Sequence, residues 1–267
     1  MKTIKLSNTG KDVRYLQELL LQNGYKQEIN GTFDEATREN VILFQSKHNL
    51  DTDGIVGIVC WDALTFSNRP AQEKITEEDI ILAANMLDVE PACLKAVLKV
   101  ETGGRGGFLA PGKPAILFEA HHFWRELKNV GIDPVPLQKE HPNILSPTWN
   151  QELYKGGIKE YDRLNEAMKI HEVAALMSIS SGIGQIMGSN HKLCGEKSVI
   201  VFMEKEKKSE QNQLRHFIIF LHKSKLTQFL IAKDWANFAK GYNGPSYEKH
   251  QYHLKLKSAY EELTKQK

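Results

Sequence analysis

One carboxylate attracts attention because an apolar helical stripe leads directly to it. Leu94, Val97 and Leu98 follow the i, i+3, i+4 spacing, and Glu101 comes seven residues after Leu94. In a helix this spacing places the Glu101 carboxylate on the same face as the leucines, toward the core. Burial raises the pKa of a carboxyl group, and a general acid must still be protonated near neutral pH. The alternative is a solvated carboxylate at a frayed helix end.

The segment after Glu101, TGGRGG, has four glycines, which would let a bulky ligand approach closely. Further along, PAILFEAHHFW contains Glu119 beside His121 and His122. Glu119 could be a second acid or an orienting partner, and the alternative is the start of a surface helix. The sequence therefore offers one strong and one weaker candidate for acid–base chemistry.

Two later stretches could supply polar groups to the same cleft. The run SSGIGQIMGSN carries Gln185 among glycines, so either its backbone lies close to a ligand or two helices cross tightly there. The run KGYNGPSY places Tyr242 and Asn243 before a Gly-Pro turn, where they could line a polar cleft. The alternative is a helix C-terminus followed by proline.

Helices must position most of these residues. Thr76, Glu77, Glu78 and Asp79 resemble a capping box, and the chain from there to the C-terminus is predicted to be mainly helical. Segments 102–115 and 131–147 are rich in Gly and Pro and predict loops with a short hairpin. Residues 173–191 lack charge but are too polar for a membrane span. From charge alone, residues 196–215 are predicted to be a solvated helix or loop.

Residues 1–66 form a separate small unit in this interpretation. One helix is predicted after residue 10 and ends at Asn23-Gly24, and a second follows Asp34 as N-cap. The apolar and core-facing positions are expected to be Val13, Leu16, Leu19, Leu20, Ala36, Val41, Phe44 and Gln45. The segments NGTFDEAT and DGIVGIVC repeat one turn-plus-helix pattern. Residues 67–75 are predicted to be a linker and 76–267 a second domain.

Composition narrows the classes of function. The chain has 267 residues and a formal net charge of +2, without a basic stripe interleaved with aromatics, so nucleic-acid binding is not expected. Three scattered cysteines argue against a disulfide framework or a zinc ribbon. The N-terminus shows no apolar signal-peptide core. A monomer without a cofactor is the simplest expectation, since each unit has the apolar residues to bury its own core.

The first 66 residues resemble a known module. LSNTGKDVRYLQELLLQNGY, NGTFDEAT and FQSKHNLDTDGIVGIVCWDAL closely resemble the peptidoglycan-binding module of many cell-wall hydrolases, across nearly all of residues 5–65. The resemblance implies binding to the cell wall, with contacts from residues near the turns, namely Tyr25, Asn30, Phe33 and Asp53. The sequence departs from the family pattern at Asn30, Asp34 and Cys60.

The rest of the chain resembles the lysozyme-like superfamily, including goose-type lysozymes and soluble lytic transglycosylases. At finer grain, VETGGRGGF, GKPAILFEAHHFWR, SGIGQIMG and DWANFAKGYNGPSYEKHQYHLKL are similar to the N-acetylmuramidase domain of bacteriophage endolysins, over most of residues 78–262. The fold implied is mainly α: a small three-helix peptidoglycan-binding domain, then a larger lysozyme-like helical domain with a short hairpin. The architecture resembles that of modular endolysins from phages of Gram-negative bacteria.

This resemblance implies hydrolysis of the β-1,4 bond between N-acetylmuramic acid and N-acetylglucosamine, with lysis of the host cell. Glu101 would be the general acid, while Gln185, Tyr242 and Asn243 would contact the glycan or hold Glu101. Glu119 would be structural or would help to position water. The protein would accumulate in the host cytoplasm, and a separate membrane-permeabilising protein would release it to the wall.

Three alternatives remain open at this point. A lytic transglycosylase would use one Glu as acid and base and would leave an anhydro sugar. A zinc amidase would need about three converging ligands, for which His250 and His253 supply at most two, so no metal site is predicted. A wall-binding protein with an inactive lysozyme-like domain would not need Glu101.

Overall fold

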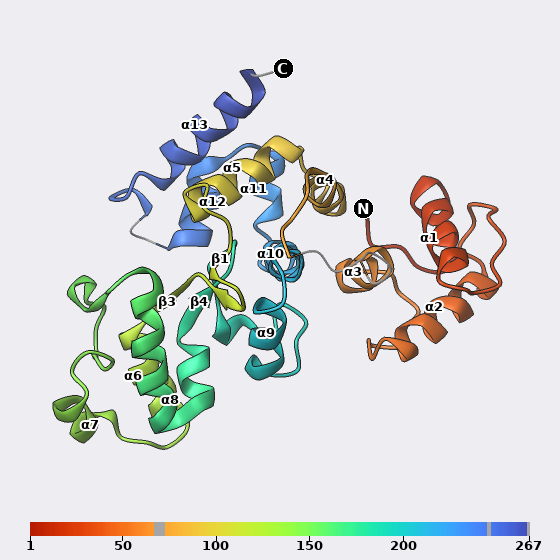
Figure 1. Ribbon diagram of the computed structural model, residues 1–267. Coiled ribbons are helices and arrows are strands. Elements are labelled where there is room, and N and C mark those ends of the chain that lie inside the picture. The colour runs from red at the N-terminus through yellow and green to blue at the C-terminus, as the bar shows by residue number, and fades with distance from the viewer. Residues whose placement is uncertain (67–72, 245–246, 266–267) are drawn as a thin grey trace. The chain divides into compact units, whose positions relative to one another are not determined.

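The computed structural model describes residues 1–66, 73–244 and 247–265 (Figure 1). Contacts divide the chain into two compact units, Met1–Ala71 with Ile81–Pro91 and Gln72–Ile80 with Ala92–Lys267. Helix α4 (Glu77–Leu87) therefore contributes to both units. Most of the predicted linker, residues 67–72, lies outside the described residues, and the division into 1–66, 67–75 and 76–267 stays a prediction.

The first unit is built on α1 (Lys11–Gln22), α2 (Glu35–Lys47) and α3 (Ile58–Phe66). The predicted stripe of α1 is buried, and the Asp34 side chain caps α2 by accepting a hydrogen bond from Thr37 N at 2.8 Å. The prediction for Ala36 is wrong, because this residue is exposed and Thr37 is buried in its place. Gln17 and Gln27 both donate to the Thr37 hydroxyl, which explains why a polar residue occupies the buried position.

The predicted repeat is present at atomic detail in two turns. The Gln17 amide donates to Asn30 Oδ1 at 2.8 Å and accepts from Gly31 N at 2.8 Å. The Gln45 amide repeats this arrangement with Asp53 Oδ1 and Gly54 N, both at 2.9 Å. Gly31 and Gly54 have φ values of 76° and 71°, a left-handed conformation that favours glycine. Each glutamine thus fixes one glycine turn to the preceding helix.

The second unit is mainly helical. Its helices after α4 are α5 (Pro91–Thr102), α6 (Ala120–Asn129), α7 (Pro134–Glu140), α8 (Glu160–Met177), α9 (Val199–Glu206), α10 (Glu210–Lys223), α11 (Thr227–Ile231), α12 (Trp235–Asn243) and α13 (Tyr252–Lys265), with short 3-10 helices at Gln151–Leu153, Gly157–Lys159 and Gly188–Asn190. Helix α6 packs on α8, α9 on α8 and α10, and α12 on α13 (Figure 1). The Gly and Pro content of residues 131–147 predicts a loop, but α7 forms there because Asp133 caps it and Pro134 suits its first turn.

Two small antiparallel sheets interrupt the helices. The predicted hairpin is formed by β1 (Phe108–Ala110) and β2 (Lys113–Pro114). A second sheet has the order β3 (Ile116–Phe118), β4 (Ile179–Ser181) and β5 (Ile186–Met187). Leu117 lies opposite Ser180, and Ser181 lies opposite Ile186. This sheet brings the segment around Glu119 together with the glycine-rich segment around Gln185.

The prediction of a solvated segment at 196–215 is wrong. Glu206, Glu210 and Gln213 are 1%, 6% and 1% exposed, and their polar atoms are bonded inside the unit. Charge alone misled here, because buried carboxylates with partners look like surface residues in a sequence. Within the described residues, no helix combines the length and apolar character that a membrane crossing requires.

Candidate active site

Glu101 lies in the last turn of α5 and is half-buried. Leu94, Val97 and Leu98 of the same helix are buried, so the stripe identified in the sequence does face the core. Burial raises the pKa of Glu101 to about 7, and a hydrogen bond from the Asn243 amide to Oε1, at 3.2 Å, partly opposes that rise. A solvated helix-end carboxylate would show no such shift, so this is an acid that keeps its proton near neutral pH.

The glycines after Glu101 have two different uses. Gly103 and Gly104 adopt φ values of 57° and 77°, and a Cβ on Gly104 would meet no atom within 4 Å. A Cβ on Gly106 would lie 2.6 Å from Glu210 Oε1, and a Cβ on Gly107 would lie 1.9 Å from Gln213 Oε1. Gly103 and Gly104 leave the protein surface after Glu101 open. Gly106 and Gly107 instead make room for the Glu210 and Gln213 side chains of α10.

Tyr242 and Asn243 form the C-terminal end of α12, which Gly244 closes at φ 80°. The Tyr242 ring stacks on Phe238, with ring centroids 5.4 Å apart, and its hydroxyl donates to Gly184 O. Burial, followed by the nearby Glu101 carboxylate, raises the pKa of Tyr242 well above its usual value. These residues therefore end a helix instead of standing on a turn, and Pro245 of the expected Gly-Pro turn lies outside the described residues.

Gln185 supports the sheet beside the site. The residue adopts φ 43°, and its side-chain amide donates to Gly182 O at 2.9 Å and to Ala115 O at 3.1 Å. Ser180 Oγ donates to its Oε1 at 3.0 Å. A Cβ on Gly184 would lie 2.7 Å from the Phe217 ring. Close packing of the turn between β4 and β5 against Phe217 of α10 thus accounts for the glycine at position 184. The expected crossing of two helices is wrong, because this run forms two strands and a turn.

Glu119 belongs to a second polar cluster. It precedes α6, and its Oε2 accepts a hydrogen bond from the Tyr154 hydroxyl at 2.6 Å and lies 3.4 Å from His121 Nδ1. Tyr154 in turn accepts from the indole N–H of Trp149 at 2.9 Å, and Trp149 is 51% exposed. Burial raises the pKa of Glu119 despite the Tyr154 hydrogen bond. Tyr154 and Trp149 could not be identified from the sequence, because both lie about thirty residues after Glu119 in an irregular segment.

Tyr252 of α13 is a further neighbour of Glu101 that the sequence did not reveal. Burial and then the charge of Glu101 raise the pKa of Tyr252, which places its phenol within electrostatic reach of the acid. Among the described residues, no group of three or more His, Cys, Asp or Glu side chains could hold a metal ion. The ligand set that the zinc-amidase alternative requires is therefore missing from this part of the chain.

The four wall-binding candidates occupy different environments in the first unit. Asn30 and Asp53 are exposed and cap the two repeated turns, while Tyr25 is half-buried and packs edge-on against Phe44. Phe33 is fully buried, which excludes a direct contact between its side chain and a ligand. Phe33 instead belongs to the apolar core of this unit, because burial is favourable for a large apolar side chain.

Comparisons with known proteins identify both parts of the chain. Residues 90–264 match the N-acetylmuramidase family, and residues 9–64 match a peptidoglycan binding domain. The crystal structure of the Burkholderia AP3 phage endolysin is 36% identical, with a TM-score of 0.66, and the match covers 99% of this chain and 100% of that chain. A search of curated proteins gave no match. The chain therefore belongs to the N-acetylmuramidase family, with a peptidoglycan-binding domain in front of the muramidase domain.

Proposed function

We propose that Glu101 is the general acid with which this phage endolysin cleaves the β-1,4 bond between N-acetylmuramic acid and N-acetylglucosamine. Membership of the muramidase family makes the chain a glycoside hydrolase that acts on peptidoglycan. The observation that carries the assignment is the place of Glu101 at the end of the core-facing stripe of α5, with the Asn243 amide 3.2 Å from Oε1. Burial there raises the pKa of Glu101 to about 7. At this pKa a large fraction of the enzyme holds the proton that the leaving oxygen needs.

The Asn243 amide supports this role from α12. Its hydrogen bond to Glu101 Oε1 fixes the orientation of the carboxyl group and limits how far burial raises the pKa. Tyr242 and Gln185 act one step further out, since Tyr242 binds Gly184 O and Gln185 binds the sheet. In this proposal all three hold the acid and its surroundings, and Asn243 also borders the glycan.

Glu119 is the candidate for positioning the attacking water. Its pKa is also raised by burial, but its hydrogen-bond partner is Tyr154, whereas that of Glu101 is Asn243. A hydrolase that inverts configuration holds its two carboxyl groups about 6.5–9.5 Å apart, with water between them. Glu119→Gln should then reduce hydrolysis without removing the ability of Glu101 to protonate the leaving oxygen.

In the first unit, Tyr25, Asn30 and Asp53 are proposed to contact peptidoglycan. Asn30 and Asp53 lie in the two repeated turns and are exposed, and Tyr25 follows the end of α1 and is half-buried. We also propose that the protein is a monomer and does not bind nucleic acid. It would reach the cell wall from the host cytoplasm once the membrane has been permeabilised.

The test is a digestion of purified peptidoglycan by the wild type, Glu101→Gln and Glu119→Gln, with soluble products identified by mass spectrometry. Reducing-end muramic acid from the wild type, and no products from Glu101→Gln, are expected. Anhydromuramyl ends would instead assign the enzyme to the transglycosylase reaction. Equal activity of Glu101→Gln and the wild type would show that another residue is the acid.

A further inference from the structure

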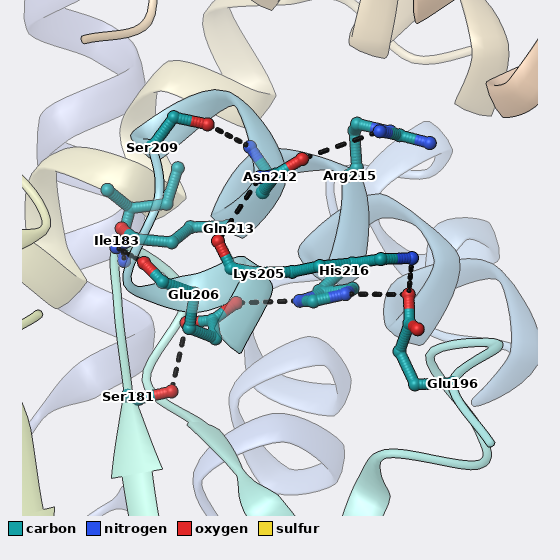
Figure 2. A network of polar contacts seen from close by, with 10 residues as sticks. All are labelled: Ser181, Ile183, Glu196, Lys205, Glu206, Ser209, Asn212, Gln213, Arg215 and His216. Carbon is teal, nitrogen blue, oxygen red and sulfur yellow. Dashed lines mark hydrogen bonds and ion pairs between the residues drawn. The ribbon is translucent and has the colours of Figure 1, made fainter. Parts of the chain in front are cut away.

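A buried polar network joins α9 and α10 to the turn that follows β4. At its centre is His216 of α10, which is 2% exposed (Figure 2). Its Nδ1 lies 2.7 Å from Glu206 Oε1, and its Nε2 lies 3.1 Å from Glu196 Oε1. Lys205 Nζ also contacts Glu196 Oε1, at 2.6 Å. The network thus places one histidine between two carboxylates inside the muramidase unit.

The geometry specifies the protonation state of His216. A carboxylate only accepts hydrogen bonds, and an imidazole ring can donate from both nitrogens only as the imidazolium ion. Burial opposes this charged form, but the hydrogen bonds and charges of Glu196 and Glu206 raise the pKa of His216 above its usual 6.5. The ring also stacks on Phe202, with centroids 4.5 Å apart, which fixes its plane.

Other titratable groups approach the network from neighbouring elements. The pKa of the Cys194 thiol is raised by burial and by the charges of Glu206 and Glu196. The Tyr242 phenol of α12 is reached by the charge of Glu206. Arg215 is adjacent in the chain, and its Nη1 lies 3.4 Å from Asn212 Oδ1 (Figure 2). Of the charged groups around His216, Glu196 and Glu206 are the ones that raise its pKa.

The network binds residues 181–185, here called the 181–185 turn, at two atoms, Ser181 Oγ and Ile183 N. Glu206 Oε2 accepts from Ser181 Oγ at 2.9 Å. Gln213 accepts from Ile183 N at 3.0 Å and donates to Glu206 O at 2.9 Å. A Cβ on Gly182 would lie only 2.4 Å from Glu206 Oε2, so this carboxylate packs closely against the backbone of the turn. A change in the position of Glu206 would therefore move the 181–185 turn.

The same turn contacts the end of α12 that holds Glu101. Tyr242 donates to Gly184 O, and the next residue, Asn243, donates to Glu101 Oε1. Helix α10 also holds the loop after Glu101, because Glu210 Oε1 accepts from Gly107 N at 2.7 Å. Two segments beside the proposed general acid are thus anchored on one helix, close to His216.

We propose that His216, as an imidazolium ion between Glu196 and Glu206, is a positioning residue that fixes the 181–185 turn, and through Tyr242 and Asn243 the orientation of Glu101. This inference rests on the proposed role of Glu101. His216 itself does not touch the glycan. Loss of its two hydrogen bonds would let Glu206 move and loosen the turn, and misplacement of a catalytic group by about 1 Å can reduce the rate roughly 100-fold.

The test compares full-length His216→Gln with His222→Gln, an exposed histidine of the same helix. Initial rates would be measured on soluble peptidoglycan glycan strands over a range of concentrations, well below the unfolding temperature of each variant. His216→Gln is expected to lower kcat about 10- to 100-fold, with KM changed less than threefold. His222→Gln should match the wild type. A merely structural His216 would lower the unfolding temperature and leave kcat unchanged.

The pH dependence of activity cannot isolate His216, because Glu101 also titrates and affects activity. The pH dependence of unfolding is therefore used as a second readout. Since the folded-state pKa of His216 is raised, its contribution to stability is complete below about pH 6.5 and is lost as pH rises through the folded pKa. The unfolding temperature of the wild type and of His222→Gln should carry this pH-dependent component, and His216→Gln should lack it. Ring-nitrogen NMR signals of His216 should show both nitrogens protonated at pH 6.5.

Ser181→Ala covers the case in which His216→Gln does not fold. This change removes only the bond from the turn to Glu206, so kcat should fall while the pH dependence of unfolding stays that of the wild type. Wild-type kcat in Ser181→Ala, or in folded His216→Gln, would overturn the proposal. Glu101→Gln is assayed in parallel, because an active Glu101→Gln would overturn the proposed general acid instead.

Discussion

The burial of Glu101 serves catalysis but lowers the stability of the folded protein. A general acid must hold its proton at neutral pH, and burial achieves this by making the ionised form unfavourable. The same burial makes the folded protein less stable wherever the carboxyl group is forced to ionise. The raised pKa is therefore a statement about stability as well as chemistry.

Glu101→Gln should abolish glycan cleavage and stabilise the protein above pH 7. In the wild type the folded state holds the proton up to about pH 7 and the unfolded state only to about 4.5, so stability falls as pH rises between these values. One pKa unit corresponds to about 1.4 kcal/mol, so the gain at pH 8 should be at most about 3.5 kcal/mol. Urea unfolding at pH 4 and pH 8 measures it.

Glu262→Gln is the matched control, because Glu262 is an exposed carboxylate paired with Lys99. That change should leave both activity and stability close to those of the wild type at either pH, since exposed ion pairs contribute little. A stability gain of equal size in both variants would mean that burial of Glu101 has no special cost.

Asn243→Ala should shift the alkaline limit of activity upward. The Asn243 amide is the hydrogen-bond donor that opposes the rise in the Glu101 pKa, so its removal lets burial act without opposition. The pH at which kcat falls to half should increase by roughly 0.5–1 unit, while the maximal rate falls about tenfold because the carboxyl group loses its fixed orientation. An unchanged or lowered alkaline limit would contradict the assigned hydrogen bond.

At the scale of elements, periodic stretches were predictable and polar interiors were not. The spacing of Leu94, Val97 and Leu98 placed Glu101 correctly on a buried face, because periodicity depends only on neighbouring residues. The charge of residues 196–215, which include Glu206, predicts a solvated segment, whereas Glu206 is buried. The burial of this segment depends on partners such as Ser181 and Ile183, which come from a different part of the chain. Charge content cannot reveal such partners.

The glycines of the 181–185 turn illustrate the same limit, since either a ligand or protein packing could have required them. Gly184→Ala should destabilise the protein by about 1–3 kcal/mol, because the new Cβ would lie 2.7 Å from Phe217. Gly57→Ala is the control, since a Cβ there meets nothing within 4 Å. It should change stability by less than about 1 kcal/mol. Equal losses in thermal unfolding would show that packing against Phe217 is not the cause.

At the scale of the whole molecule, the two units solve different physical problems. The muramidase unit buries charged and polar groups to hold an acid, whereas the first unit repeats one glutamine-anchored turn twice around an apolar core. The turns leave Asn30 and Asp53 exposed, and Tyr25, which follows α1, is half-buried. Binding to the wall and cleavage of glycan are thus assigned to separate residues, so each should be removable without the other.

Tyr25→Ala should weaken binding to insoluble sacculi about tenfold, because a truncated aromatic contact typically costs about 1–2 kcal/mol of binding free energy. Its kcat on short soluble glycan strands should equal that of the wild type, because the acid lies in the other unit. Leu43→Ala is the control, an exposed apolar residue of the same unit at 57% exposure. Co-sedimentation with sacculi measures binding. Equal losses for both variants would assign the effect to general apolar contact, and a parallel fall in soluble-substrate kcat would contradict the separation of the two functions.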